Sequence, residues 1–356
     1  MERLYLDHAA TTPLLPAARE AMTQVLGDWA NPSSPHQEGR RARAMLEDAR
    51  RRIAARLGLK GRLIFTSGAS EALALALGRA RAGTRLVSAV EHDAVLRAAP
   101  DVVRLPVDRL GRIDLAALER ALGQAGERPL VAVQHVNNET GVIQPIAAVA
   151  ALVHDAGGIL LCDCAQSAGK LPLPEADMIA VSAHKLGGPP GIGALIIADD
   201  RLIEPMGGQE GGYRGGTENV PAAAGFAAAV EAWPDRLADW ERLRARLEEG
   251  LKTAGGEIVA GEAERLPSIV AARMAGVPAA TQLMHFDLAG IAVSAGAACA
   301  SGSMKPSHVL GAMGWSEDAA REVIRLSFGP ETDAADIDRF LAAWRDLAER
   351  SGAAAA

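Results

Sequence analysis

The chain has 356 residues, of which 49% are hydrophobic and 23% are charged. These fractions are typical of soluble globular proteins and argue against a largely disordered chain. With a formal net charge of −7, the basic surface typical of nucleic-acid-binding proteins is not expected, and no run of about 18 uncharged apolar residues predicts a membrane span. Because single cores stop growing at about 250–300 residues, two domains are expected.

Two features predict a cytoplasmic protein. The first residues, MERLYLDHAATTPLL, lack the basic and apolar regions of a signal peptide. The three cysteines, Cys162, Cys164 and Cys299, are too few for a disulfide framework and fit a reducing compartment. The pair Cys162 and Cys164 could also indicate a metal site. Since no second Cys/His pair lies nearby in the sequence, packing in a core is the favoured interpretation.

The first half of the chain predicts strands that alternate with helices. A short strand is expected at 4–6, a helix from Pro16, a loop at 31–36 and an arginine-rich amphipathic helix up to Leu57. Further strands are expected at 62–66, 84–90 and 129–135, and further helices at 71–81, 93–98 and 146–155. This alternation predicts a mostly parallel sheet covered by helices on both faces.

Polar segments follow several of the predicted strands, at 67–71, 91–92, 137–139 and 163–166. Ligands of parallel sheets bind at the carboxyl ends of the strands. The Gly/Ser turn at 67–70 opens a helix and offers free N–H groups that suit a phosphate, although many such turns bind nothing. Several such strand ends in series favour a ligand site over a set of unrelated turns.

The stretch 157–193 carries the strongest chemical signal. A buried strand ends at Asp163, and a second apolar run at 178–181 is followed by Ser182, His184 and Lys185. An acid and a lysine at two strand ends could meet on one ligand, where the acid would pair with a ring nitrogen and the lysine would supply an amine. Lysine is scarce, so Lys185 has few competitors: the others are Lys60, Lys170, Lys252 and Lys305.

The second half begins with a strand at 194–198 and a glycine-dense loop at 207–219, whose composition favours close approach of the backbone to a ligand or another subunit. Helices from 221 to 254, broken at Pro234, are expected to bridge two domains. A smaller α/β unit follows, with strands at 258–259, 268–272 and 291–293 and helices at 279–287, 317–323 and 333–350. Cys299 lies in the small-residue stretch 294–303, which favours an accessible thiol. The tail 353–356 is expected to be disordered.

These motifs together resemble the cysteine desulfurases, the type that feeds iron–sulfur cluster assembly, within the pyridoxal-phosphate enzymes of the class V aminotransferase group. The motifs are Asp7-x-Ala9-Ala10-Thr11-Thr12-Pro13, Thr66-Ser67-Gly68-Ala69-Ser70-Glu71, Glu91-His92, Asn137-Asn138-Glu139-x-Gly141, Asp163-x-x-Gln166, His184-Lys185, Arg214-x-Gly216-Thr217-Glu218-Asn219, Ala298-Cys299 and Arg325-Leu326-Ser327-x-Gly329. They cover nearly the whole chain in the order of the family.

The resemblance implies an α/β architecture of the pyridoxal-phosphate fold type I. It implies a large cofactor-binding domain at 14–250, and a small domain formed by 1–13 and 251–356 that carries Cys299 and Arg325. It also implies a homodimer, L-cysteine as the substrate and a sulfur-acceptor protein such as an iron–sulfur scaffold. Neither nucleic acid nor a membrane is an expected partner. No metal is expected in the site.

The resemblance also assigns roles to individual residues. Lys185 would bind the cofactor covalently, Asp163 would pair with the ring nitrogen, and His92 would stack on the ring and carry protons. Cys299 would accept the sulfur. The expected binding residues are Asn138 and Gln166 for the ring substituents, Ser70, Ser182 and His184 for the phosphate together with Thr217 from the other subunit, and Arg325 with Asn138 for the substrate.

Some alternatives stay open at the level of sequence. A selenocysteine lyase, a cysteine-sulfinate desulfinase and a non-catalytic, cofactor-bound sulfur-transfer module share most of these motifs. His8, Ala297 and Pro330 depart from the family pattern, which leaves substrate preference and rate open. The bland alanine tail predicts a reduced docking segment for a scaffold partner.

Overall fold

The computed structural model describes residues 3–27, 30–100, 102–296 and 306–352. Cys299, Ala297 and the alanine tail lie outside the described residues, so the predictions made for them stay predictions. The described helices are α1 (Pro16–Leu26), α2 (Gln37–Leu57), α3 (Ala69–Arg79), α4 (Asp93–Ala98), α5 (Leu115–Gln124), α6 (Ile146–Asp155), α7 (Val220–Ala232), α8 (Leu237–Thr253), α9 (Ala279–Leu288), α10 (His308–Ala312), α11 (Glu317–Ala320) and α12 (Ala334–Ser351). Short 3₁₀ helices span Ala183–Leu186, Asp200–Leu202 and Glu210–Gly212.

The strands form three sheets. They are β1 (Leu4–Tyr5), β2 (Arg62–Thr66), β3 (Arg85–Ser88), β4 (Val103–Leu105), β5 (Leu130–Gln134), β6 (Ile159–Asp163), β7 (Met178–Ser182), β8 (Gly193–Ile197), β9 (Glu257–Ile258), β10 (Ile269–Arg273), β11 (Ile291–Ala292), β12 (Ser294–Ala295) and β13 (Val323–Ser327). The largest sheet has the order β2-β8-β7-β6-β5-β3-β4. Within it β8 runs opposite to the other strands, which are parallel to one another, and this confirms the predicted mostly parallel sheet.

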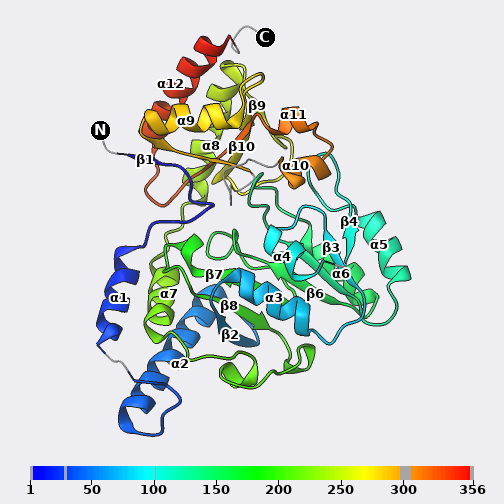
Figure 1. Ribbon diagram of the computed structural model, residues 1–356, viewed down its shortest axis with the longest axis vertical. Coiled ribbons are helices and arrows are strands. Elements are labelled where there is room, and N and C mark those ends of the chain that lie inside the picture. Colours follow the sequence, from blue (N-terminus) through cyan, green and yellow to red (C-terminus); the bar gives the residue numbers. More distant parts are fainter. Residues whose placement is uncertain (1–2, 28–29, 101, 297–305, 353–356) are drawn as a thin grey trace.

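Helices cover both faces of this sheet, as Figure 1 shows. Alternate residues of each strand point to opposite faces. In β2, Ile64 packs in the core cluster that includes α3 and α4, whereas Leu63 and Phe65 pack in the cluster that includes α2, α6 and α7. The strands β5 to β8 are buried at every position because both faces are covered.

The two ends of the chain meet in a second, smaller unit at the top of Figure 1. β1 pairs in parallel with β11, and β12-β13-β10-β9 form an antiparallel sheet. Phe286, Phe340 and Trp344 of α9 and α12 pack against one another beside it. The β1–β11 pairing supports the predicted division of the chain into 14–250 and the two ends, which stays a prediction.

The helix predicted at 317–323 is wrong in its second half. The expected helix at 317–323 ends at Ala320, and Val323–Ser327 forms β13, which pairs with β10 on one side and β12 on the other. The apolar residues of β13 are buried, and Arg325 interrupts an apolar run that would otherwise indicate a central strand. The helices α5 and α10 and the strand β4 were not predicted, and α3 begins two residues before the expected start.

No helix in the described part of the chain is long and apolar enough to span a membrane.

Candidate active site

A cavity of about 350 Å³ lies at the carboxyl ends of the central strands. It brings together the four polar segments that the sequence placed after predicted strands. Among the lining residues are Ser67, Ser70, Glu71, His92, Asn138, Asp163, Gln166, Ser182, His184 and Lys185. All of the predicted cofactor-binding residues except Thr217 therefore line one cavity.

A second cavity of about 710 Å³ adjoins the first and shares His92, Asn138 and Lys185 with it. Arg325 lines only this second cavity. Its lining also includes Ser294, Ala295, Gly296 and Pro306, the described residues on either side of 297–305. The site thus has two adjoining compartments, and Lys185 lies where they meet.

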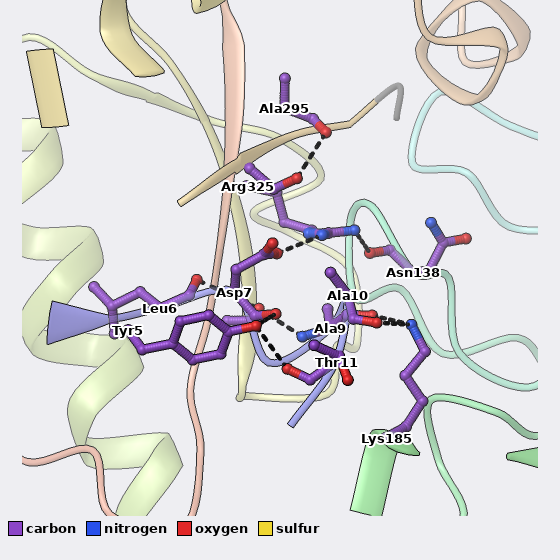
Figure 2. Close-up of polar contacts among 12 residues, drawn as sticks. Tyr5, Leu6, Asp7, Ala9, Ala10, Thr11, Asn138, Lys185, Ala295 and Arg325 are labelled. Carbon is purple, nitrogen blue, oxygen red and sulfur yellow. Dashed lines mark hydrogen bonds and ion pairs between the residues drawn. The ribbon is translucent and has the colours of Figure 1, made fainter. Parts of the chain in front are cut away.

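Lys185 lies in the 3₁₀ helix that follows β7. Its amine donates hydrogen bonds to the carbonyl oxygens of Ala9 and Ala10, at 2.8 Å for Ala10 (Figure 2). Burial lowers the pKa of Lys185 to about 8, nearby Arg325 adds to this effect, and Asp163 and Asp7 oppose it. At neutral pH a larger fraction of the Lys185 amine is therefore neutral than in an ordinary lysine, and the neutral amine is the nucleophilic form.

Asp163 is the last residue of β6 and is 8% exposed. Its Oδ1 accepts a hydrogen bond from the backbone N–H of Ala165 at 2.9 Å. Burial raises the pKa of Asp163 above its usual value, although the Ala165 hydrogen bond and electrostatic interactions with His92 and Lys185 oppose this rise. A cationic ring nitrogen bound beside this carboxyl would favour its ionised form.

His92 caps the N-terminus of α4, with Nδ1 accepting from the Ala94 backbone N–H at 3.1 Å. An Nδ1 that accepts carries no proton, so the neutral ring has its proton on Nε2. Burial lowers the pKa of His92, which favours this neutral ring. The capping bond fixes the ring at the boundary of the two cavities.

The first cavity also has the features of an anion-binding site. Helix α3 begins there after Gly68, whose φ of 156° is tolerated best by glycine, and no side chain caps the helix. Residues 68–71 of this first turn line the same cavity as Ser182 and His184, and the first N–H groups of a helix have no partner within the helix. His184 Nδ1 lies 3.2 Å from Thr11 Oγ1, and burial lowers the pKa of His184 to about 4.

Strand register explains how this turn reaches Ser182. Both Thr66, at the end of β2, and Ser182, at the end of β7, pair with Gly193 at the start of β8. A Cβ at Gly193 would lie 2.5 Å from the carbonyl oxygen of Val181 and 2.7 Å from Gly68 Cα. Glycine at position 193 therefore lets the turn and the end of β7 approach each other.

Arg325 is 5% exposed and lies between two partners that are distant in the sequence (Figure 2). Its Nη2 contacts Asp7 Oδ1 at 2.7 Å, and its Nη1 donates to the carbonyl oxygen of Asn138 at 2.9 Å. Its buried Nε has no hydrogen-bond partner among the described residues. A planar fork held at the edge of a cavity suits a carboxylate.

Glu139 was quoted within a motif but received no role from the sequence. It is buried and accepts a hydrogen bond from Ser307 Oγ at 2.5 Å. It also lies against Gly296, where an added Cβ would be 2.3 Å from Glu139 Oε2. Glu139 therefore contacts the chain on both sides of 297–305. The sequence signal that could have identified Glu139 as a site residue was its place in the Asn-Asn-Glu motif.

Two other predictions have different outcomes. Thr217 is exposed and does not line the first cavity, so this chain's own Thr217 is not part of that cavity; its contribution from the other subunit stays a prediction. Cys162 and Cys164 are buried free thiols with their Sγ atoms 3.6 Å apart, and the described residues contain no group of three potential metal ligands. This arrangement fits packing.

Comparisons with known proteins agree with this geometry. The model of the aminotransferase class-V family matches residues 4–340. The cysteine desulfurase of Cereibacter sphaeroides is 38% identical over 367 residues, which cover 96% of this chain and 94% of that protein. The NifS-like protein of Rickettsia africae has a similar structure, with a TM-score of 0.90 and 33% identity over 98% of this chain and 100% of the other. The structure of SspA in complex with cysteine has a TM-score of 0.80 and 30% identity, and covers 93% of this chain and 100% of the other. The chain therefore belongs to the class-V aminotransferase family.

Proposed function

We propose that the protein is a pyridoxal-phosphate-dependent cysteine desulfurase that converts L-cysteine to L-alanine and receives the sulfur on Cys299 as a persulfide. The observation that carries the proposal is the junction of two cavities at Lys185, one with Asp163 and an anion-binding turn and the other with Arg325. The relatives named cysteine desulfurase and the SspA complex with cysteine support this substrate.

The residues of the first cavity fit pyridoxal phosphate, the cofactor of this family. Asp163 would pair with the ring nitrogen, and the N-terminus of α3 would hold the phosphate with Ser70, Ser182 and His184. Gln166 donates from Nε2 to the carbonyl oxygen of Ala9 at 2.9 Å, but its buried Oε1 has no partner among the described residues. This unpartnered acceptor lines the same cavity as Asn138 and suits a hydroxyl substituent of the ring.

When bound, the cofactor acts as an electron sink that weakens the bonds around the Cα of the amino-acid substrate. Lys185 would hold the cofactor through its amine, and the same amine would take the proton from the Cα of the substrate. Its lowered pKa suits this base role near neutral pH. His92 would lie against the ring of the bound cofactor, and its Nε2 would carry protons at the boundary of the two cavities.

Arg325 binds the substrate carboxylate in the second cavity. Its guanidinium is already oriented by Asp7 and by the carbonyl group of Asn138, so little side-chain freedom is lost on binding. The residues that flank 297–305 line the same cavity, so a cysteine bound by Arg325 would lie in the cavity next to that segment.

The sulfur step uses the thiolate of Cys299. The thiolate attacks the sulfur of the substrate, so that an S–S bond forms while the Cβ–S bond breaks. The electron pair of the broken bond stays on the substrate carbon, which is then protonated and leaves as part of alanine. Because the thiolate is the nucleophile, turnover should fall at low pH.

We extend the proposal to a homodimer in which Thr217 of the partner subunit completes the phosphate site. The exposure of Thr217 outside this chain's own cavity supports this arrangement. We also propose that an iron–sulfur scaffold protein accepts the persulfide sulfur. A cytoplasmic location is proposed from the low cysteine count and the two buried free thiols.

The test compares Cys299→Ser with Cys162→Ala, a matched control at a buried cysteine outside both cavities. Alanine and sulfide are measured after addition of cysteine. Cys299→Ser should keep the spectrum of the bound cofactor and lose turnover, whereas Cys162→Ala should keep both. Normal turnover of cysteine by Cys299→Ser contradicts the proposal. Parallel assays with selenocysteine and cysteine sulfinate separate the related activities, because their chemistry depends less on an acceptor thiol.

A further inference from the structure

Arg214, in the glycine-rich loop before α7, pairs with Glu71 in the first turn of α3. The Arg214 Nε lies 2.8 Å from Glu71 Oε1, and the two side chains are only 22% and 31% exposed. The other carboxylate oxygen of Glu71 accepts the backbone N–H of Ser67 at 2.5 Å. A continuous chain of contacts therefore runs from the loop, through Glu71, to the Gly/Ser turn that lines the first cavity.

Glu71 has two opposite electrostatic effects in this position. A carboxylate in the first turn is favourable for the dipole of α3. The same carboxylate lines the cavity and would repel a phosphate bound at that turn. Burial raises the pKa of Glu71, but the hydrogen bonds from Arg214 and Ser67 outweigh it and lower the pKa below its usual value. The carboxylate is therefore charged near neutral pH and needs a counter-charge.

The loop holds Arg214 in place through an independent anchor. Glu210, which is buried, pairs with Arg50 of α2 at 2.7 Å and accepts the backbone N–H of Phe65 in β2 at 2.8 Å. Gln209 and Arg214 pair across the loop. The base of the loop is thus fixed to α2 and to β2, the strand that leads into α3. The loop therefore holds the Arg214 guanidinium in place before any ligand binds.

We propose that Arg214 is a positioning residue of the cofactor-phosphate site. It neutralises Glu71 and holds that carboxylate on the Ser67 N–H, which leaves the N–H groups of residues 69–71 directed at the phosphate without an opposing charge. This inference rests on the pyridoxal-phosphate site of the proposed function and is independent of its sulfur-transfer step.

The experiment measures the dissociation constants of two probes for the cofactor-free protein, by equilibrium titration of absorbance or fluorescence. Pyridoxal phosphate carries the phosphate, and pyridoxal lacks it. Arg214→Gln should weaken binding of pyridoxal phosphate by about tenfold or more, because it leaves an uncompensated carboxylate near the phosphate. Its affinity for pyridoxal should stay within about twofold of that of the native protein.

A second substitution separates charge from structure. Glu71→Gln removes the charge and keeps an oxygen that can accept from Ser67, so Glu71→Gln/Arg214→Gln should bind pyridoxal phosphate within about threefold of native. Glu71→Gln alone should bind it at least as tightly as native, a result that does not depend on the folding of Arg214→Gln. Arg246→Gln, which breaks an exposed pair with Asp338 between α8 and α12, is the matched control and should change neither affinity.

The inference is overturned if Arg214→Gln binds pyridoxal phosphate like the native protein, if it loses pyridoxal equally, or if the double variant does not recover. Weaker binding of pyridoxal phosphate by Glu71→Gln also overturns it. Desulfurase activity is measured separately with cysteine. Failure of that assay with these affinities as expected would refute the proposed function and leave the role of Arg214 standing.

Discussion

The amine of Lys185 lies 2.8 Å from the carbonyl oxygen of Ala10, although 175 positions separate the two residues in the sequence. Ala9 also accepts from Lys185 and from the Gln166 amide. The segment after β1 therefore contacts the lysine and the ring-binding side of the first cavity, and it lines the second cavity. Residues near the start of the chain thus help to form the boundary at which cofactor and substrate would meet.

The lowered pKa of Lys185 predicts how attachment of the cofactor depends on pH. Only the neutral amine reacts, and its fraction rises as the pH rises through the pKa of about 8, instead of 10.5 for an ordinary lysine. The rate at which pyridoxal phosphate binds covalently to the cofactor-free protein should therefore rise with a midpoint of about 8. The measurement follows the absorbance of the lysine-bound cofactor, near ~420 nm, at a series of pH values.

Two variants check that this midpoint belongs to Lys185. Asp163 raises the pKa of Lys185 through its negative charge, so Asp163→Asn should shift the midpoint to lower pH. Lys185→Ala should show no such absorbance, whereas Lys252→Ala, at an exposed position of α8, should behave like the native protein. A rate that is flat between about pH 7 and 9 contradicts the role given to Lys185.

The fixed guanidinium of Arg325 predicts a specific kinetic change in Arg325→Lys. Lysine keeps the positive charge beside Asp7 but cannot offer two parallel hydrogen bonds to a carboxylate. A hydrogen bond to a charged group contributes about 1.5–3 kcal/mol, so the KM for cysteine should rise by about 10- to 150-fold, with a smaller change in kcat.

Steady-state kinetics with cysteine measure this change, and Arg321→Lys is its control. Arg321 is half exposed at the end of α11 and pairs with Glu317, away from both cavities. Its substitution should leave KM and kcat as they are. If Arg325→Lys is half-saturated at the same cysteine concentration as the native enzyme, Arg325 does not bind the substrate carboxylate.

The close approach at Gly193 predicts a loss of both stability and cofactor affinity in Gly193→Ala. The added Cβ would force apart Val181 and the turn at Gly68, at an expected cost of about 1–3 kcal/mol in the free energy of unfolding. The displaced turn should also bind pyridoxal phosphate more weakly. Gly78, in α3, has open space around it, so Gly78→Ala should instead stabilise the protein by up to about 1 kcal/mol.

Urea unfolding and cofactor titration test this pair of substitutions. The account of the turn is wrong if Gly193→Ala unfolds at the same urea concentration as the native protein and retains its cofactor affinity.

The sequence predicted the parts of the site that depend on local signals. Asp163 and Lys185 each follow a short apolar run, and parallel strands necessarily bring their carboxyl ends to one edge of a sheet. The Gly/Ser turn before α3 was visible for the same reason. The resemblance to a family added the roles, which the residue pattern alone could not supply.

Contacts between distant segments could not be predicted from the sequence. Asp7 and Arg325 are 318 positions apart, and Arg214 and Glu71 are 143 positions apart, so no local periodicity indicates either pair. Strand β13 was missed because a single arginine interrupts its apolar run. In contrast, α5 had a usable signal in the N-cap Asp114 and an amphipathic pattern that the sequence analysis did not use.

The central claim is that sulfur passes from cysteine to Cys299. Mass spectrometry of the peptide that contains Cys299, after the protein with bound cofactor has been mixed with cysteine, tests it most directly. The account predicts the added mass of one sulfur atom on Cys299, formed together with alanine and absent from Lys185→Ala. Release of alanine and sulfide with unmodified Cys299, or the same adduct on Cys162 or Cys164 instead, would contradict it.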